Sequence, residues 1–492
     1  MSDPGYEPRR SRLGSARRWV PRAPIIIVVV AAMAAAVVFD GTEPDRDASA
    51  AGGGRDAPAI PRADALSVSW YCPEGTAGGR ADETLLVANL GGEDAAAVVT
   101  VFDGDDEPAR ERVDVPARGQ VEVELAELTD EQEALLADGN IAGPGVMVEA
   151  FGGEVVVEHA VVGDGGFAVG PCARGAAPEW FFASGTTVRG TELMLNLFNP
   201  FGDDAIVDLM FLTDTGVQTP DGAEALIVPR GSRVSVPVHA LVQRQVQVAT
   251  AVRARTGRVV AEQSLASDGS EIAAGFGLSL GAAGPSDTWT LPYGSVNAPG
   301  AHTVSVANFG ENGSEVEVRV DVDDGERIEP ETVPVPARSV AVVDVGGLAP
   351  AGAAYAVDVQ ATGAEPVVVD ELLTLAGDGA GGLALDSGAP EAARRWAFAG
   401  AAGLDADAIV SVVNPGPRPV TASLSVYGSD DGESPSPPEL ELGAGERGSF
   451  DLEELEIGAD QVLLVRADGP VIAERLLVTE SGGSLDAGVP GR

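Results

Sequence analysis

The chain has 492 residues, of which 45% are hydrophobic and only 5% aromatic, and its formal net charge is −45 at pH 7. A surface this acidic repels phosphate groups, so the composition argues against nucleic-acid binding. At about 100–150 residues per domain, the length predicts three to five domains.

The N-terminal 39 residues are typical of a membrane anchor. Residues 1–22 are basic and contain six arginines, and residues 23–39, APIIIVVVAAMAAAVVF, carry no charge. A helix of this length spans about 26 Å, just enough for the hydrocarbon core of a bilayer. The arginines before it and the aspartates after it predict a cytoplasmic N-terminus and a single transmembrane signal-anchor at 23–39.

A cleaved signal peptide is the competing interpretation, because Ala34–Ala36 offers an A-x-A cleavage site. Both interpretations place everything after residue 39 on the extracytoplasmic side of the cell membrane. Residues 40–64 are rich in Gly, Ala, Pro and Asp and are expected to be a flexible linker.

Beyond the linker the sequence repeats itself four times. One tryptophan opens each unit, at spacings of 110, 109 and 107 residues: Trp70, Trp180, Trp289 and Trp396. A motif asparagine follows each tryptophan after 18 or 19 residues: Asn89, Asn199, Asn308 and Asn414. Each unit closes with a Val-rich strand that carries a glutamate and then a Gly-rich run, the glutamates being Glu158, Glu262, Glu371 and Glu474. Landmarks in one order at a fixed period indicate an internal repeat.

The pattern within each unit is that of short strands. Apolar and polar residues alternate with period two, as in VEVRVDV at 316–322, and Gly, Pro and Asp turns separate the alternating stretches. We therefore predict an all-β protein of four tandem immunoglobulin-like β-sandwich repeats of about 108 residues. Their expected bounds are 65–175 (repeat 1), 176–283 (repeat 2), 284–390 (repeat 3) and 391–492 (repeat 4). A β-propeller with two blades per repeat is the alternative, and residues 125–139 suggest one inserted helix.

The repeated residues have structural and functional interpretations. Each tryptophan is expected to pack in a core or a domain junction rather than to form a platform for sugar. Each asparagine is expected to stabilise the turn that follows it. The four glutamates are expected to occupy one structural position, and each is expected to accept hydrogen bonds inside its own sandwich, because a carboxylate in an apolar strand is costly without partners.

The two cysteines, Cys72 and Cys172, both fall in repeat 1. Outside the cytoplasm such a pair predicts a disulfide. The three histidines lie at unrelated positions, and the Asp/Gly turns match no calcium loop, so no metal or other cofactor is expected. The sequence contains no P-loop motif, and no catalytic residue is expected.

The sequence pattern "N-P/G … A-x-V-x-V … VPA-x-S" resembles that of the adhesion-type and immunoglobulin-like repeats of bacterial cell-surface proteins. The basic N-terminus, the anchor and "WYCP" at Trp70–Pro73 together resemble an uncharacterised actinobacterial family of secreted or membrane-anchored proteins. The resemblance covers most of the chain, and its motifs are structural, so it implies a location and a fold and no activity.

These observations favour a structural or binding protein of the cell envelope rather than an enzyme. The expected role is a scaffold or an accessory to the assembly of envelope polysaccharide or protein, with the membrane as one partner through residues 23–39. A carbohydrate-active or other hydrolytic enzyme is one alternative. An envelope sensor that binds a partner through its short cytoplasmic tail is another.

Overall fold

A computed structural model describes residues 57–73, 81–102, 107–128, 135–137, 140–163, 165–295, 301–323, 328–375, 382–401, 403–428, 437–480 and 482–491. All of them belong to one unit, Ala51–Arg492. The basic segment 1–22, the anchor 23–39 and the linker up to residue 56 lie outside the described residues. Within the described ranges, no helix combines the length and the apolar character needed to cross a bilayer.

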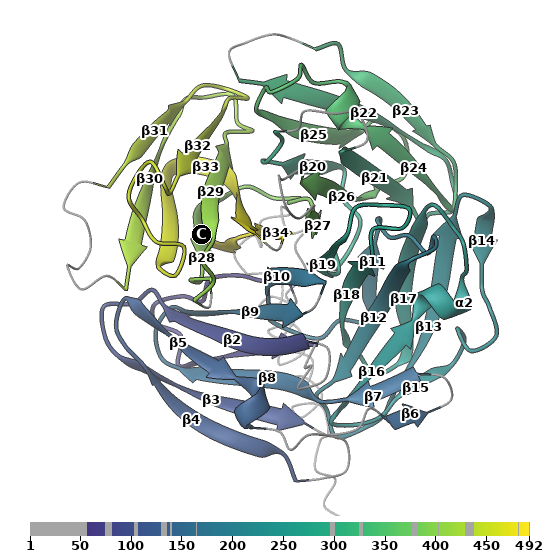
Figure 1. Cartoon of the computed structure of the whole chain (residues 1–492), viewed down its shortest axis with the longest axis horizontal. Coiled ribbons are helices and arrows are strands. Elements are labelled where there is room, and N and C mark those ends of the chain that lie inside the picture. Colours follow the sequence, from purple (N-terminus) through teal and green to yellow (C-terminus); the bar gives the residue numbers. More distant parts are fainter. Residues whose placement is uncertain are drawn as a thin grey trace, which may run out of the picture. The chain divides into compact units, whose positions relative to one another are not determined.

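Each repeat contributes two antiparallel sheets, an inner and an outer one (Figure 1). In repeat 1 the outer sheet has the order β1-β8-β3-β4 and the inner sheet the order β10-β9-β2-β5. The bounds are β1 Ser67–Cys72, β2 Ala81–Asn89, β3 Ala95–Phe102, β4 Ala109–Val115, β5 Gly119–Glu124, β8 Gly145–Phe151, β9 Val155–Gly163 and β10 Gly166–Pro171.

Repeat 2 has the outer order β11-β17-β13-β14, with β15 also on β13. Its inner order is β19-β18-β12-β16-β7-β6, in which β6 (Leu135–Ala137) and β7 (Asn140–Gly143) come from the end of the chain segment of repeat 1 that precedes β8. The bounds are β11 Glu179–Phe182, β12 Thr191–Asn199, β13 Ala205–Thr213, β14 Gly216–Gln218, β15 Leu226–Val228, β16 Ser232–Pro237, α2 Val238–Leu241, β17 Val248–Thr256, β18 Val260–Ser267 and β19 Gly275–Leu280.

Repeat 3 has the outer order β20-β25-β22-β23 and the inner order β24-β21-β26-β27. The bounds are β20 Thr288–Leu291, β21 His302–Asn308, β22 Ser314–Val322, β23 Glu331–Val335, β24 Ser339–Asp344, the 3-10 helix Val345–Gly347, β25 Tyr355–Ala361, β26 Val368–Leu375 and β27 Gly382–Ser387.

Repeat 4 uses one long strand, β33, in both of its sheets. Its outer part pairs with β28 and β30, and its inner part pairs with β29 and β34. The bounds are β28 Ala393–Phe398, β29 Asp407–Val413, β30 Val420–Tyr427, β31 Glu439–Leu442, β32 Arg447–Asp451, β33 Val462–Thr479, β34 Gly482–Ala487 and β35 Val489–Gly491.

The two kinds of sheet have different sequence patterns because they meet different surroundings. In β22 of an outer sheet, Val316, Val318 and Val320 are buried while the residues between them are partly exposed. In β9 of an inner sheet, residues 155–161 are all buried. A strand buried on both faces is expected to be continuously apolar, which accounts for the Val-rich strand that closes each repeat.

The last strands of the four inner sheets, β10, β19, β27 and β34, lie together at a common centre (Figure 1). Each contacts the next in chain order, and β34 contacts β10, so the series is closed. The strands begin with glycines because the backbones come close there. A Cβ at Gly275 would lie 2.5 Å from the Leu383 backbone nitrogen, and one at Gly382 would lie 2.9 Å from that of Gly483.

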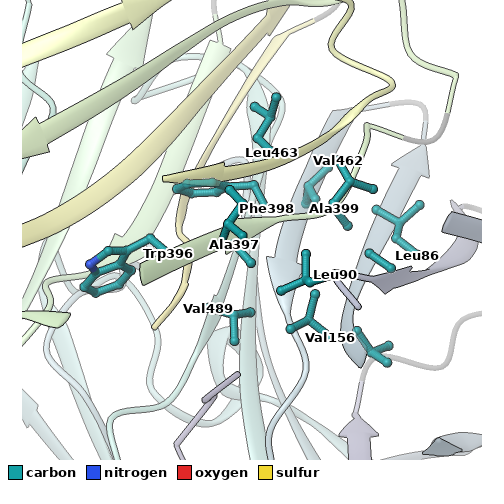
Figure 2. Packing of buried hydrophobic residues seen from close by; sticks show 14 of the residues in the cluster. Leu86, Leu90, Val156, Trp396, Ala397, Phe398, Ala399, Val462, Leu463 and Val489 are labelled. Atoms are coloured by element: carbon teal, nitrogen blue, oxygen red, sulfur yellow. The ribbon is translucent and has the colours of Figure 1, made fainter. Parts of the chain in front are cut away.

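The hydrophobic cores are shared between repeats. One cluster of buried residues joins repeats 1 and 4, and Figure 2 shows Leu86, Leu90 and Val156 of repeat 1 beside Ala399 and Val462 of repeat 4. The other two large clusters also draw residues from more than one repeat. The expectation of β-sandwiches is confirmed, and neighbouring sandwiches share their hydrophobic cores.

The expected helix at 125–139 is also wrong. The structure has a 3-10 helix at Leu125–Glu127, then β6 at Leu135–Ala137 and β7 at Asn140–Gly143. Strand β7 pairs with β16, so this insertion of repeat 1 extends the inner sheet of repeat 2. Residues 129–134 lie outside the described part of the chain.

Candidate functional site

The four motif tryptophans form the same contact in every repeat. Each indole is buried, and its Nε1 donates a hydrogen bond to the backbone oxygen of a valine at the start of the Val-rich strand. The pairs are Trp70 to Val155 at 3.2 Å, Trp180 to Val259 at 2.7 Å, Trp289 to Val367 at 2.9 Å and Trp396 to Val471 at 2.7 Å. Each tryptophan therefore ties an outer strand to the inner one, and its buried ring is not available as a platform for sugar.

The four motif asparagines are buried and fully hydrogen-bonded. Asn199 shows the pattern: its Nδ2 donates to the backbone oxygens of Asp203 and Val228, and its Oδ1 accepts from the nitrogen of Phe201. The corresponding contacts recur at Asn89, Asn308 and Asn414. Each side chain joins the turn that follows it to a second strand, which accounts for its recurrence.

The valines that accept the tryptophan hydrogen bonds provide an alignment of the four Val-rich strands. This alignment changes which residue of repeat 3 holds the repeated carboxyl position. Counting three residues on from each valine gives Glu158, Glu262, Asp370 and Glu474, so Asp370 holds the repeated position in repeat 3. The sheet register agrees, because Glu262 pairs with Asn196 and Asp370 with Ser305, each three residues before the motif asparagine. The prediction that Glu371 occupies this position is therefore wrong.

The repeated carboxyl group contacts a neighbouring repeat. Asp370 Oδ2 accepts from the backbone nitrogens of Ala183 and Ser184 in repeat 2, at 2.6 and 3.0 Å. Glu474 Oε2 accepts from the nitrogen of Tyr293 in repeat 3 at 2.7 Å. The expectation that every partner lies within the same sandwich is wrong, because the inner strands face the neighbouring repeat at the centre. Asp370 combines both kinds of partner, since its Oδ1 also accepts from the Ser387 hydroxyl of its own repeat at 2.7 Å.

The interface between two repeats at the centre is called a seam here. The seam between repeats 1 and 2 holds a buried triad of side chains. His159 Nδ1 lies 2.8 Å from Glu83 Oε1, and its Nε2 lies 2.9 Å from Glu262 Oε1. All three side chains are buried. Burial lowers the pKa of His159, but the charges and hydrogen bonds of Glu262 and Glu83 outweigh it and raise the pKa well above its ordinary value. A protonated His159 then donates to a carboxylate from each repeat.

The seam between repeats 4 and 1 closes the series. Arg475 Nη2 lies 3.1 Å from Glu158 Oε2, and its Nε lies 3.0 Å from Asp486 Oδ2. Arg475 also donates to the backbone oxygen of Ala399. Burial raises the pKa of Glu158 to about 8, although Arg475 opposes the shift. One guanidinium thus holds two buried carboxyl groups, one from repeat 1 and one from repeat 4.

The seam between repeats 3 and 4 gathers carboxyl groups instead. Glu371, Glu474 and Asp386 are all buried here, and neither oxygen of Glu371 has a hydrogen-bond partner among the described residues. Burial raises the pKa of all three well above the ordinary values. His302 Nε2 lies 2.6 Å from Glu371 Oε2, and its Nδ1 lies 2.9 Å from the Tyr355 hydroxyl.

Sequence reasoning missed the residue that follows the repeated carboxyl group. This position differs in every repeat and contributes to the interior polar contacts: His159, Gln263, Glu371 and Arg475. A polar residue next to a carboxylate in a Val-rich strand is a signal that the sequence does contain. Glu83, Asp386 and Asp486 carry no comparable signal.

The cysteines form the predicted disulfide, Cys72–Cys172. It joins the end of β1 to the segment after β10, where Tyr71 and Ala173 also exchange backbone hydrogen bonds. In the part of the chain that the structure describes, no three His, Cys, Asp or Glu side chains are arranged to hold a metal ion.

Comparison with known proteins gives limited information. Residues 148–371 match a protein family described as "Family of unknown function (DUF5719)". The match begins in β8 of repeat 1, covers repeat 2 and ends in β26 of repeat 3, so it includes two of the seams. The search of curated proteins found no match.

Among solved structures, the Anabaena sensory rhodopsin transducer is 26% identical over 18% of this chain and 87% of its own length. Its TM-score of 0.16 is too low for the similarity to support an argument about fold or function.

Proposed function

We propose that this chain is an extracytoplasmic, membrane-anchored structural or binding protein of the cell envelope. Its role is that of a scaffold or accessory in the assembly of envelope polysaccharide or protein. The basic segment 1–22 and the apolar segment 23–39 support the anchor and the orientation.

The observation that carries this proposal is the Cys72–Cys172 disulfide. The sequence has only these two cysteines, and both are in the bond. Structural disulfides persist mainly outside the cytoplasm, where no thiol pool reduces them. The pairing therefore supports an extracytoplasmic location independently of the N-terminal segment.

The role of scaffold is supported by the use of the repeated residues. The motif tryptophans, asparagines and carboxyl groups are buried and bond within the protein. Because these recurring residues pack inside the protein, they hold the repeats in a fixed arrangement. A fixed arrangement suits a scaffold, which presents its surfaces to partners. The exposed turns and faces of the repeats then remain available to a partner.

A hydrolytic enzyme is the second candidate, and one observation favours it. Burial raises the pKa values of Glu371 and Glu474 at the seam of repeats 3 and 4, and carboxyl groups with raised pKa values are a feature of some acid–base catalysts. The two side chains are, however, at most 1% exposed, so a substrate cannot reach them in this conformation. The pair is better explained as part of the fold.

A reporter fusion tests the proposed location. An enzyme that is active only outside the cytoplasm, fused after Arg492, should be active in cells, whereas the same enzyme fused after Arg22 should not. The chain should appear in the membrane fraction with its N-terminal residues intact. Activity of only the Arg22 fusion would contradict the topology, and a soluble product beginning near Val37 would contradict the retained anchor.

A further inference from the structure

The inner sheet of repeat 2 receives an added strand from another repeat. Without it β16 would be the last strand of that sheet, but β7 of repeat 1 pairs with β16 and sets Ile141 opposite Ser235. Figure 1 shows β7 and β6 on the side of β16 that faces away from the common centre. With β7 in place, Arg233, Val234 and Ser235 of β16 are all buried. The fold therefore accepts an added strand at this edge of an inner sheet.

The strands that correspond to β16 in the other repeats lack this cover. They are β5, β24 and β32, each of which pairs with the strand that leads to the motif asparagine. Among the described residues, each of the three pairs with that one strand only. In repeats 2, 3 and 4 the connections that correspond to the β6–β7 segment contain no strand; they are residues 238–247, 345–354 and 452–461.

Of these three edges, β24 has the least protection against a further strand. Exposed edges are commonly protected by charged side chains. Strand β5 exposes Glu122 and Glu124, and Arg447 at the start of β32 is bonded to repeat 3. Strand β24, with the sequence SVAVVD, carries no charge before Asp344, and its Val342 is 47% exposed.

Val342 holds the position that Ser235 holds in repeat 2. Each pairs with the residue three positions before the motif asparagine, which is Asn196 for Ser235 and Ser305 for Val342. Ser235, on the strand that β7 covers, is only 4% exposed. The exposed valine of β24 therefore lies where a strand is added elsewhere in the same chain, and burying it would be favourable.

The charge of the protein indicates the kind of strand that would bind. The chain carries a net charge of −45, and Glu331 of β23 and Asp344 of β24 are both exposed. Arg338, just before β24, is paired with Glu311. A second copy of this chain would bring the same negative charge, whereas an uncharged strand flanked by basic residues would be attracted.

We propose that the open edge of β24 binds an extended segment of another protein, uncharged where it pairs and basic on either side, which adds to the inner sheet of repeat 3 as β7 adds to that of repeat 2. In such binding, main-chain hydrogen bonds supply affinity and alternate side chains supply specificity. The inference deepens the proposed function and rests on it for the binding role. Its test uses purified protein, so a negative result would leave the outcome of the reporter fusions unaffected.

The test is the binding of a labelled peptide to the full-length protein in detergent, measured by fluorescence anisotropy. The peptide contains the β7 sequence Asn-Ile-Ala-Gly twice between terminal arginines, and its control carries a methyl group on every backbone nitrogen and cannot pair as a strand. We expect saturable binding of the first peptide only. Bound peptide should slow hydrogen exchange in β24 and not in β5. No binding, equal binding of both peptides, or protection elsewhere than in β24 would overturn the proposal.

Val342→Asp separates strand addition from attraction between charges. The substitution is at an exposed position and should leave the fold intact, but the added strand would cover the new carboxylate, so we expect the affinity to fall by about tenfold. Val162→Asp is the control, at a valine that is 40% exposed in β9, a strand with a neighbour on each side, and it should bind as the wild type does.

Unchanged or tighter binding to Val342→Asp would overturn the proposal, because the peptide would then be held by charge alone. A dimer of the wild type that Val342→Asp dissociates would also overturn it, because a second copy would then occupy the edge. If Val342→Asp does not fold, the two peptides and the hydrogen exchange of the wild type decide the question.

Discussion

Glu158 and Arg475 are 317 positions apart in the chain, yet their side chains lie 3.1 Å apart and are both fully buried. The contact joins repeat 1 to repeat 4, so the series of four sandwiches is closed rather than open. An open series would leave the inner sheets of its two end repeats exposed on one side. Closure buries these faces and requires a polar partner for every carboxyl group at the centre.

Arg475→Met tests this closure. The substitution keeps an apolar side chain of similar length but leaves Glu158 and Asp486 without their cation, and breaking a buried ion pair in this way typically costs about 3–5 kcal/mol. We expect a loss of that size in guanidinium chloride unfolding at neutral pH. Arg255→Met, which removes a partly exposed pair with Asp208, is the control and should have little effect. Equal losses in the two variants would contradict the importance of the closing contact.

Glu262→Ala tests the seam between repeats 1 and 2. It removes a partner of the buried His159, and we expect the free energy of unfolding to fall by about 1–3 kcal/mol. A double-mutant cycle with His159→Ala should show that the two losses are not additive, because the residues contact each other at 2.9 Å. Additive losses, or an unchanged stability with loss of a ligand interaction, would show that Glu262 has a different role.

The motif asparagine should matter equally in every repeat. Asn199→Ala leaves two backbone oxygens and one backbone nitrogen without their partner, and we expect a loss of about 1–3 kcal/mol. The same substitution at Asn89, Asn308 or Asn414 should cost a similar amount. Asn312→Ala, at an exposed turn of repeat 3, should cost less. An effect confined to one of the four motif positions would indicate a local function there.

The sequence predicted the repeat and its internal supports but not the seams. The tryptophans and asparagines recur at fixed spacing because each bonds within one repeat. A residue that recurs at a fixed spacing can be recognised from the sequence alone. The seam partners Glu158 and Arg475 come from different repeats, and no periodic pattern links them. Asp370 was missed because Asp and Glu are adjacent in repeat 3, so the glutamate alone suggested an alignment shifted by one residue.

The disulfide should stabilise more than repeat 1. Replacing Cys72 and Cys172 by serine opens a loop of 100 residues, for which the chain-entropy model gives about 4–5 kcal/mol. Because one hydrophobic cluster joins repeats 1 and 4, hydrogen exchange should increase in both, and not in repeat 1 alone. Labelling of two thiols in the denatured, unreduced wild type would contradict the bond itself.

Asp370 gives a pH dependence of known sign at the seam between repeats 2 and 3. Burial raises its pKa to about 6 from an ordinary value of 3.8, although the hydrogen bonds from Ser387, Ser184 and Ala183 oppose the shift. The folded protein therefore retains a proton that the unfolded chain loses. The resulting stabilisation is complete below about pH 3.8 and is lost as the pH rises through about 6.

Asp370→Asn mimics the protonated form at every pH. Its Oδ1 can accept from Ala183 and Ser184, and its Nδ2 can donate to the Ser387 hydroxyl. We expect the variant to gain stability relative to the wild type as the pH rises from about 4 to about 7, with the difference constant above that range. Asp287→Asn, at an exposed position of the same repeat, should show no such trend. A difference that is independent of pH, or that falls as the pH rises, would mean that Asp370 is ionised in the folded protein and binds the two nitrogens as a carboxylate.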